Sequence, residues 1–251
     1  MIPETAKPVF QSIISTFRRT RDKGRLRILD VGCSYGINAA MLKCDLEMED
    51  LYSFYDPGVV AGAKRHELIE RDRRLLNDLV KDRELEVVGL DASEPAISYA
   101  TEARLLNGGV SADLEAAGPA PQDAEVLRGV DLVISTGCIG YVSESTIERI
   151  LEVNAPRRPW MAHFVLRMFP FDRIQKVLTN FGYVTEKIET QTFLQRRFAT
   201  QDERRQVLSR LGGLGIDAEG READGWYHAE AFISCPEEDC SSFDLRPLVS
   251  M

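Results

Sequence analysis

The sequence has no run of about 18 apolar residues, the length that a membrane-spanning helix needs, so we expect no membrane partner. It also has no basic excess: 31 Lys and Arg stand against 40 Asp and Glu, which gives a net charge of −9. Because duplex nucleic acid is bound by clustered basic surface, we expect no nucleic-acid partner. The first turn carries acidic Glu4, and no apolar signal-peptide core follows, so we expect no secretory leader.

Metal ligands and paired cysteines are scarce. Histidine occurs three times, and no two histidines lie at a ligand spacing, so we expect no metal site. The five cysteines are an odd number without C-x-x-C spacing. This usage predicts reduced thiols in a cytoplasmic protein.

The length and composition fit one α/β domain. A chain of 251 residues accommodates one large domain, or a domain with an inserted subdomain, and the hydrophobic fraction of 44% suffices for a core. We expect a single domain over residues 1–235 and a loosely held acidic, serine-containing tail over 236–251. The sequence is also compatible with a homodimer.

The stretch from Arg27 to Ala40, RILDVGCSYGINAA, is the centre of the predicted fold. Residues 26–31 are nearly all apolar, as in a strand buried on both faces of a parallel sheet. Gly32 and Gly36 then mark a tight turn, and helix-forming residues follow. A strand, a glycine-rich turn and a helix start present free backbone N–H groups at the positive end of a helix dipole.

Three interpretations of this turn remain open from the motif alone. Gly32 to Gly36 match G-x-S-x-G, the nucleophile elbow of α/β-hydrolases, with Ser34 as nucleophile and His163 or His228 as base. The same residues fit a glycine-rich cofactor loop that begins at Asp30, with Ser34 in place of its middle glycine. A turn that only lets a helix pack on the sheet is the third interpretation.

A long insertion follows the first strand–helix unit. The acidic residue that ends the second strand of a dinucleotide-type fold lies about 20 residues beyond the glycine turn. The best second strand here is 85–90, which ends in Asp91, 55 positions after Gly36 (91 − 36). The extra stretch, Asp45 to Arg83, contains an aromatic cluster and a charged helix. We read it as a helical insertion at the carboxyl edge of the sheet, either a lid or a purely structural element.

The rest of the chain alternates strands with helices and ends in paired strands. An N-terminal helix is predicted over 3–20, and later helices over 93–106, 171–181 and 201–211. Ser145 and Glu148 form the capping-box pattern of a further helix. Further strands are predicted over 110–114, 130–135, 161–168, 183–192 and 226–235. A closing pair of strands after strand–helix alternation indicates a mostly parallel sheet that is finished by an antiparallel strand.

Four ordered segments carry a resemblance to a known family. Asp30 to Gly36, Val88 to Asp91, Ala112 to Leu114 and Asp131 to Ser135 resemble, in order, the cofactor-binding segments of class I S-adenosylmethionine (SAM)-dependent methyltransferases. The resemblance covers roughly residues 25–235. It implies an α/β fold with a doubly wound, mostly parallel sheet, a C-terminal antiparallel strand and, in this chain, an inserted helical lid. It also implies SAM as the cofactor.

The resemblance assigns roles to individual residues. Gly32 to Gly36 would surround the methionine part of SAM, and Asp91 would hold the ribose hydroxyls. Asp113 and Leu114 would bind the adenine, and Ser135 would lie beside the methionine end. The complete implied cofactor set is Asp30, Gly32, Cys33, Ser34, Gly36, Asp91, Ala92, Asp113, Leu114 and Ser135.

A small-molecule methyl acceptor is the expected substrate. No N-P-P-[FYW] sequence, which nucleic-acid amine methylases of this fold would show by resemblance, follows the fourth strand. Methyl transfer to an oxygen or nitrogen, such as a carboxylate or phenol, is expected, with Arg167 holding an anionic group. The candidate catalytic residues are Tyr55, His66, Tyr141 and Arg167.

Each of these four residues also has a purely structural explanation, and other functions remain open. One alternative is a SAM-binding protein without catalysis. An NAD-binding oxidoreductase is less compatible, because the turn departs from G-x-G-x-x-G. The hydrolase is weakened because only one helix precedes the strand, whereas its oxyanion hole needs a loop after an earlier strand.

Overall fold

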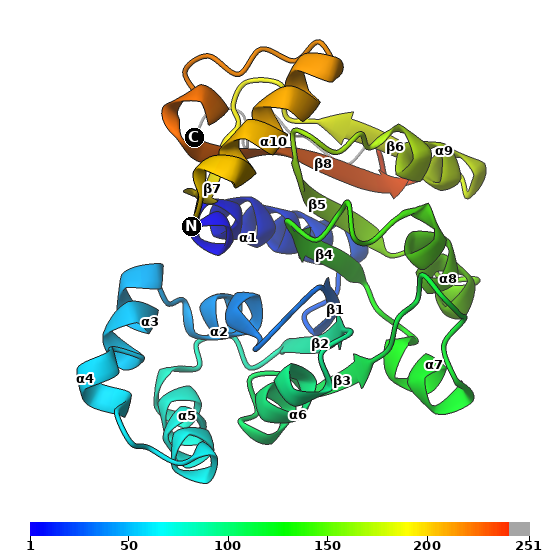
Figure 1. Ribbon diagram of the computed structural model, residues 1–251. Helices are drawn as coiled ribbons and strands as arrows, with labels where there is room; N and C mark the ends of the chain where they lie inside the picture. The colour runs from blue at the N-terminus through cyan, green and yellow to red at the C-terminus, as the bar shows by residue number, and fades with distance from the viewer. Residues whose placement is uncertain (241–251) are drawn as a thin grey trace.

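The computed structural model describes residues 1–240, and its centre is one eight-stranded sheet (Figure 1). The strand order is β3-β2-β1-β4-β5-β8-β6, and β7 also pairs with β8. The first five strands are parallel, and β8 runs antiparallel to β5. The predicted doubly wound, mostly parallel sheet with a C-terminal antiparallel strand is therefore confirmed. The strands are β1 (Leu26–Val31), β2 (Leu85–Asp91), β3 (Gly108–Ser111), β4 (Leu132–Thr136), β5 (Trp160–Leu166), β6 (Tyr183–Lys187), β7 (Phe193–Arg197) and β8 (Trp226–Pro236).

Helices cover both faces of the sheet because the central strands are apolar on both faces. In β1, Leu26 and Ile28 pack in the core cluster on one face, and Leu29 and Val31 pack in the cluster on the other. The first face carries α1 (Ile2–Arg21), α2 (Ile37–Cys44) and α6 (Glu94–Glu102). The second carries α7 (Pro121–Leu127), α8 (Glu144–Asn154) and α9 (Asp172–Asn180). Within residues 1–240, no helix is long and apolar enough to cross a membrane.

One edge of β8 is paired by two short strands instead of the single strand predicted over 183–192. Lys187 of β6 pairs with Phe232, and Phe193 of β7 pairs with Ala229 further along the same strand. The chain leaves the sheet between these two pairs. After β7, α10 (Gln201–Gly213) and the short 3-10 helix η1 (Glu222–Asp224) lead back into β8.

The predicted insertion is helical and returns to its starting point. It contains α3 (Met48–Phe54), α4 (Pro57–Val60) and α5 (Arg65–Leu79), which lie beside α2 at the β2–β3 side of the molecule (Figure 1). The backbone N–H groups of Lys81 and Asp82 both donate to the carbonyl of Lys43, at 2.8 and 3.1 Å. The two ends of the insertion therefore meet, as expected of a segment added to a complete fold.

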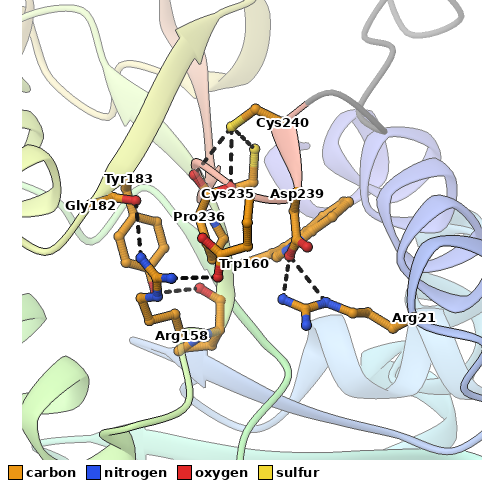
Figure 2. A network of polar contacts seen from close by, with 11 residues as sticks. Arg21, Arg158, Trp160, Gly182, Tyr183, Cys235, Pro236, Asp239 and Cys240 are labelled. Atoms are coloured by element: carbon orange, nitrogen blue, oxygen red, sulfur yellow. Dashed lines mark hydrogen bonds and ion pairs between the residues drawn. The ribbon is translucent and has the colours of Figure 1, made fainter.

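The start of the predicted loose tail is packed, which corrects that prediction for residues 236–240; residues 241–251 lie outside the described part. Figure 2 shows Asp239 between α1 and β5. Its buried carboxylate accepts a hydrogen bond from the indole Nε1 of Trp160 at 2.7 Å and pairs with Arg21. The thiols of Cys235 and Cys240 face each other, with their sulfur atoms 2.9 Å apart.

Two local predictions differ from the structure. Helix α8 is capped by Ser143, whose hydroxyl accepts from the N–H of Ser145 at 3.2 Å, so the cap lies two residues before the predicted one. Helix α7 (Pro121–Leu127) lies where the sequence predicted no helix. Its first residue is Pro121, a residue favoured in the first helical turn because the N–H it lacks would have no partner there.

Candidate functional site

A cavity of about 430 Å³ opens at the carboxyl ends of β1, β2 and β4. This is the edge at which ligands bind in open α/β sheets. We call it the strand-end cavity. Five of the residues assigned to the cofactor line it: Gly32, Asp91, Ala92, Asp113 and Leu114.

The turn after β1 requires left-handed backbone at three positions. Gly32, Ser34 and Gly36 have φ angles of +69°, +48° and +79°. A Cβ on Gly32 would lie 2.6 Å from the Cβ of Cys138, in the turn after β4, so only glycine fits there. Ser34 adopts the left-handed conformation of the glycine that it replaces in the motif, at a steric cost for a residue with a Cβ.

Asp91 holds this turn against the end of β2. One carboxylate oxygen accepts from the backbone N–H of Ser34 at 2.9 Å, and the other accepts from the N–H of Ser93 at 2.9 Å. A carboxylate has about four acceptor positions, so both oxygens can still accept from the hydroxyls of a ligand. The long insertion therefore separates Asp91 from the glycine turn in sequence but not in space.

Asp30 and Asn38 connect the end of β1, the start of α2 and the end of β4 next to the strand-end cavity. The fully buried carboxylate of Asp30 accepts from the amide of Asn38 at 3.1 and 3.2 Å, and the same amide donates to Thr136 at the end of β4, also at 3.1 Å. Burial, and secondarily the negative charge of Asp91, raise the pKa of Asp30 to about 7, although Asn38 opposes the shift. A cation that bound nearby would favour the ionised form.

Glu115 lines the strand-end cavity and joins the loop after β3 to the start of α8. It accepts from the backbone N–H of Ser143 at 2.9 Å and from the hydroxyls of Ser143 and Thr146, both at 2.5 Å. These bonds lower the pKa of Glu115 against the opposing effect of burial. Sequence reasoning missed Glu115, Thr136 and Thr146; the position of Glu115 directly after Asp113 and Leu114 was the available signal.

Two residues assigned to the cofactor point away from the strand-end cavity. Ser135 is fully buried, and its hydroxyl lies 2.8 Å from Nδ1 of His163 inside the sheet. Strand β4 continues to Thr136, so the residue that reaches the cavity is one position later than predicted. Cys33 is buried against Gly89, where a Cβ would lie 2.5 Å from its sulfur. The sequence neighbours of these two residues, Thr136 and Gly32, line the strand-end cavity instead.

The four candidate catalytic residues are not gathered at one place. Tyr141 borders the strand-end cavity, and its side chain is 82% exposed. Tyr55 lines a different cavity, under the insertion, and His66 is exposed in the first turn of α5 and borders neither of these cavities. The guanidinium of buried Arg167 donates to the carboxylate of Glu222 at 2.6 Å and to the carbonyl of Asp217 at 2.8 Å. Arg167 thus has an internal carboxylate in place of the predicted substrate anion.

The hydrolase interpretation gains no support from the histidines. Burial lowers the pKa of His163 to about 4, and its Nδ1 bonds to Ser135. His228 has its Nδ1 3.0 Å from the hydroxyl of Thr192. Ser34 instead uses its backbone N–H to bind Asp91. Within residues 1–240, neither histidine forms a hydrogen bond with Ser34, as the base of a serine nucleophile would.

A second cavity, of about 420 Å³, lies between the glycine turn and the insertion; we call it the insertion cavity. Its walls come from α2, α3, α5 and α6 and from Tyr35 and Gly36 of the turn. Tyr35, Tyr52, Tyr55 and Tyr99 contribute aromatic rings, and the rest of the lining consists of Gly36 and aliphatic or thioether side chains. The insertion therefore borders the glycine turn, but none of its residues lines the strand-end cavity, so its role as a lid stays a prediction.

No protein-family model and no curated protein sequence matches the chain. Among solved structures, the YcgJ protein of Bacillus subtilis is 10% identical and has a TM-score of 0.49, and the alignment covers 90% of this chain and 97% of that one. A TehB-like SAM-dependent methyltransferase from Corynebacterium glutamicum is 15% identical, with coverage of 92% and 96% and a TM-score of 0.38. A magnesium protoporphyrin IX methyltransferase from Synechocystis, with bound SAM, is 14% identical, with coverage of 92% and 79% and a TM-score of 0.42. None of these TM-scores reaches 0.5.

Proposed function

We propose that this chain is a SAM-dependent methyltransferase that acts on a small-molecule acceptor. The observation that carries the proposal is the strand-end cavity. Its walls bring together Gly32 of the glycine turn, the acid Asp91 at the end of β2, and Asp113 with Leu114 after β3. These are the segments that the family resemblance assigns to the cofactor, and the strand order places them side by side.

The residues of the strand-end cavity suit the three parts of SAM. Asp91 offers two carboxylate oxygens to the ribose hydroxyls. Leu114 and Ala112 give an apolar surface for the adenine, and the carboxylate of Asp113 stands beside it. Gly32 lets the methionine part approach the backbone closely. When bound, SAM supplies an electrophilic methyl group to a nucleophile of the acceptor.

The role proposed for the protein in this reaction is positioning and exclusion of water. Methyl transfer removes the sulfonium charge, so a dry site with aligned reactants accelerates it. Tyr141 is the candidate for acceptor contact, because it borders the cavity next to the turn after β4. Transfer to oxygen or nitrogen, and a cytoplasmic location, stay predictions. Arg167 has no part in the proposed acceptor site, because its guanidinium pairs with Glu222.

Calorimetry with S-adenosylhomocysteine (SAH), the product of SAM, tests the proposal. We expect the purified protein to bind SAH, and Asp91→Asn and Asp91→Ala to weaken binding by about tenfold or more, because a hydrogen bond to a charged group contributes about 1.5–3 kcal/mol. Asp78→Ala, which removes an exposed carboxylate on α5, is the control and should leave the affinity unchanged. NAD should not bind. Absence of SAH binding, or binding that is insensitive to both Asp91 variants, would overturn the proposal.

A further inference from the structure

The insertion cavity has the size and lining of a small-molecule site. Its volume of about 420 Å³ lies within the usual range for ligand pockets, about 300–1,000 Å³. Three aromatic side chains at its walls are unusually exposed for their type: Tyr35 at 51%, Tyr52 at 52% and Tyr55 at 38%. Apolar residues that are exposed singly are common on protein surfaces and need no explanation. Exposed apolar residues that gather around a hollow instead indicate a binding site.

The charge around the cavity predicts a neutral ligand. Among residues 1–240, no charged side chain lines it. Three charged side chains lie next to the tyrosine rings of its wall: Asp72; Arg65, which pairs with Glu102; and Arg71, whose Nη1 is buried without a hydrogen-bond partner in the described part of the chain. The buried carboxylate of Asp72 accepts from the hydroxyl of Tyr99 at 2.6 Å. The guanidinium of Arg71 donates to the carbonyl of Phe54 and lies 5.8 Å from the ring centre of Tyr55. Because no charged residue of the described part belongs to the lining, a charged ligand would lose its hydration here without direct contact with a counter-ion.

The tyrosine hydroxyls keep the wall neutral as well. Burial and the neighbouring Asp72 raise the pKa of both Tyr55 and Tyr99, so both stay protonated at physiological pH. Their rings face the hollow and offer flat surfaces to a ring-bearing molecule.

The insertion cavity also shares a wall with the glycine turn, which we call the cofactor turn because the proposed function places SAM beside it. Tyr35 and Gly36 belong to that turn and line the cavity, and the ring of Tyr35 meets the ring of Tyr99 edge to face, with centroids 5.6 Å apart. Ser34, the neighbour of Tyr35, is bound through its backbone to Asp91. A molecule in the insertion cavity therefore contacts the cofactor turn, which is hydrogen-bonded to Asp91 through Ser34.

We infer that the insertion cavity binds an uncharged, ring-bearing apolar small molecule, and that this molecule contacts the cofactor turn through Tyr35. The binding itself stands without the proposed function, whereas its coupling to the cofactor rests on it. Such a molecule has two sources: it is the methyl acceptor, or it is a separate effector that shifts cofactor affinity.

Two fluorescent probes that differ by one charge test the inference. N-phenyl-1-naphthylamine is neutral, and 8-anilinonaphthalene-1-sulfonate is the same ring system with a sulfonate. We expect the neutral probe to bind with one site and at least tenfold more tightly than the anionic probe. Equal affinities would overturn the assignment of a neutral ligand.

Filling the cavity should remove this binding. Leu68 lines the cavity from α5 and is only partly buried, so Leu68→Trp adds bulk there with little risk to folding. We expect Leu68→Trp to weaken the neutral probe at least tenfold. Val59→Trp is the matched control, since Val59 is 61% exposed on α4 and lies outside the lining. Circular dichroism verifies that both variants fold, and unchanged probe binding in folded Leu68→Trp would overturn the inference; Tyr52→Ser is the second variant if Leu68→Trp fails to fold.

Titrations with and without SAH separate the two sources and the two proposals. If the ligand is the acceptor, labelled methyl from SAM appears on 1-naphthol or 1-naphthylamine, and Leu68→Trp removes this transfer. If the ligand is an effector, neither naphthyl compound is methylated, and the neutral probe shifts the SAH affinity several-fold in the wild type but not in Tyr35→Ala. SAH and probe that bind with no mutual effect and no transfer would overturn the coupling. Probe binding without SAH binding would overturn the proposed function and leave the cavity assignment standing.

Discussion

Ser34 is a serine in a backbone conformation that favours glycine. At a φ of +48°, its Cβ costs about 1–2 kcal/mol relative to glycine. We therefore expect Ser34→Gly to raise the free energy of unfolding by about 1 kcal/mol in urea titrations, after allowance for the greater freedom of glycine in the unfolded chain.

The same variant distinguishes the cofactor turn from a nucleophile elbow. The backbone N–H of Ser34, which binds Asp91, is retained in Ser34→Gly and in Ser34→Ala. Both variants should keep SAH affinity within about threefold of the wild type, and a serine-directed fluorophosphonate should not label the wild type at Ser34. Labelling at this residue would contradict the account.

The buried carboxyl of Asp30 makes stability depend on pH. Its pKa is raised from 3.8 to about 7 in the folded protein, so the folded state holds a proton that the unfolded chain releases within that window. Stability therefore falls as the pH rises from about 4 to 7 and then levels off. In Asp30→Asn this dependence is absent, so its stability relative to the wild type should rise between pH 5 and 7.5.

His163 contributes with the opposite sign, so the comparison must be made between variants. Its pKa is lowered from 6.5 to about 4, and the unfolded chain therefore binds a proton first as the pH falls. This group makes the protein less stable below about pH 6.5. Subtracting wild-type from Asp30→Asn urea midpoints at each pH cancels the contribution of His163. A difference that stays constant from pH 5 to 7.5 would contradict the assignment to Asp30.

The sequence predicts residues at strand ends better than the side to which each one points. Asp91 ends β2 and reaches the strand-end cavity, as expected of an acid after a buried strand. The assignment of Ser135 to the cofactor is wrong because β4 extends to Thr136. Successive side chains of a strand point to opposite faces, so a shift of one residue moves a side chain from the cavity to the core. The partner of Ser135, His163, is 28 positions away, so no local pattern announces the pair.

At the scale of elements, the pair of Arg167 and Glu222 attaches η1 to the end of β5. Both side chains are almost fully buried, at 7% and 2% exposure. Removing one charge leaves the other buried without a partner, which costs about 3–5 kcal/mol. We expect Glu222→Gln to lower the free energy of unfolding by about 3 kcal/mol. Glu125→Gln breaks the exposed pair with Arg128 and should change it by 0.5 kcal/mol or less.

A structural role for the pair of Arg167 and Glu222 differs from the substrate role that the sequence predicts for Arg167. If Arg167 held an anionic acceptor, Glu222→Gln would leave stability intact and would change the affinity for acidic acceptors alone. Urea unfolding of the two glutamine variants distinguishes these outcomes.

Elements with strong periodicity or caps were predictable, and elements that depend on distant partners were not. Helix α1 spans Ile2–Arg21, close to its prediction, because its apolar stripe and terminal charges are local signals. Helix α7 was not predicted, because seven residues are too few to show a clear helical period. The break between β6 and β7 depends on where β8 offers partners, which the sequence of residues 183–192 does not reveal.

In the molecule as a whole, the insertion begins and ends at one point of the fold, while Met48, Leu51 and Leu76 join its helices to the core. Because Lys43 meets Lys81 and Asp82, a short Gly-Ser linker can replace residues 46–80 without separating β1 from β2. We expect the shortened protein to fold and to keep measurable SAH affinity in calorimetry. It should lose the neutral naphthyl probe, because the outer wall of the insertion cavity is gone. Complete loss of SAH binding in a folded product would show that the insertion belongs to the cofactor site.

The overall architecture was accessible from the sequence because strand–helix alternation and the glycine turn are local patterns. The contacts between residues far apart in the sequence could not be predicted in this way. Asp239 joins Arg21 and Trp160 across 218 and 79 positions, and only the folded chain shows that this acid is buried. The insertion cavity likewise depends on how α3 and α5 pack against α2 and α6.

A crystal structure of the protein with SAH tests the central claim most directly. We expect the adenosine in the strand-end cavity, with both ribose hydroxyls within hydrogen-bond distance of Asp91, the adenine against Leu114, and the homocysteine part over Gly32. SAH bound away from Asp91 and Gly32, or a strand-end cavity that stays empty at saturating SAH, would contradict this claim.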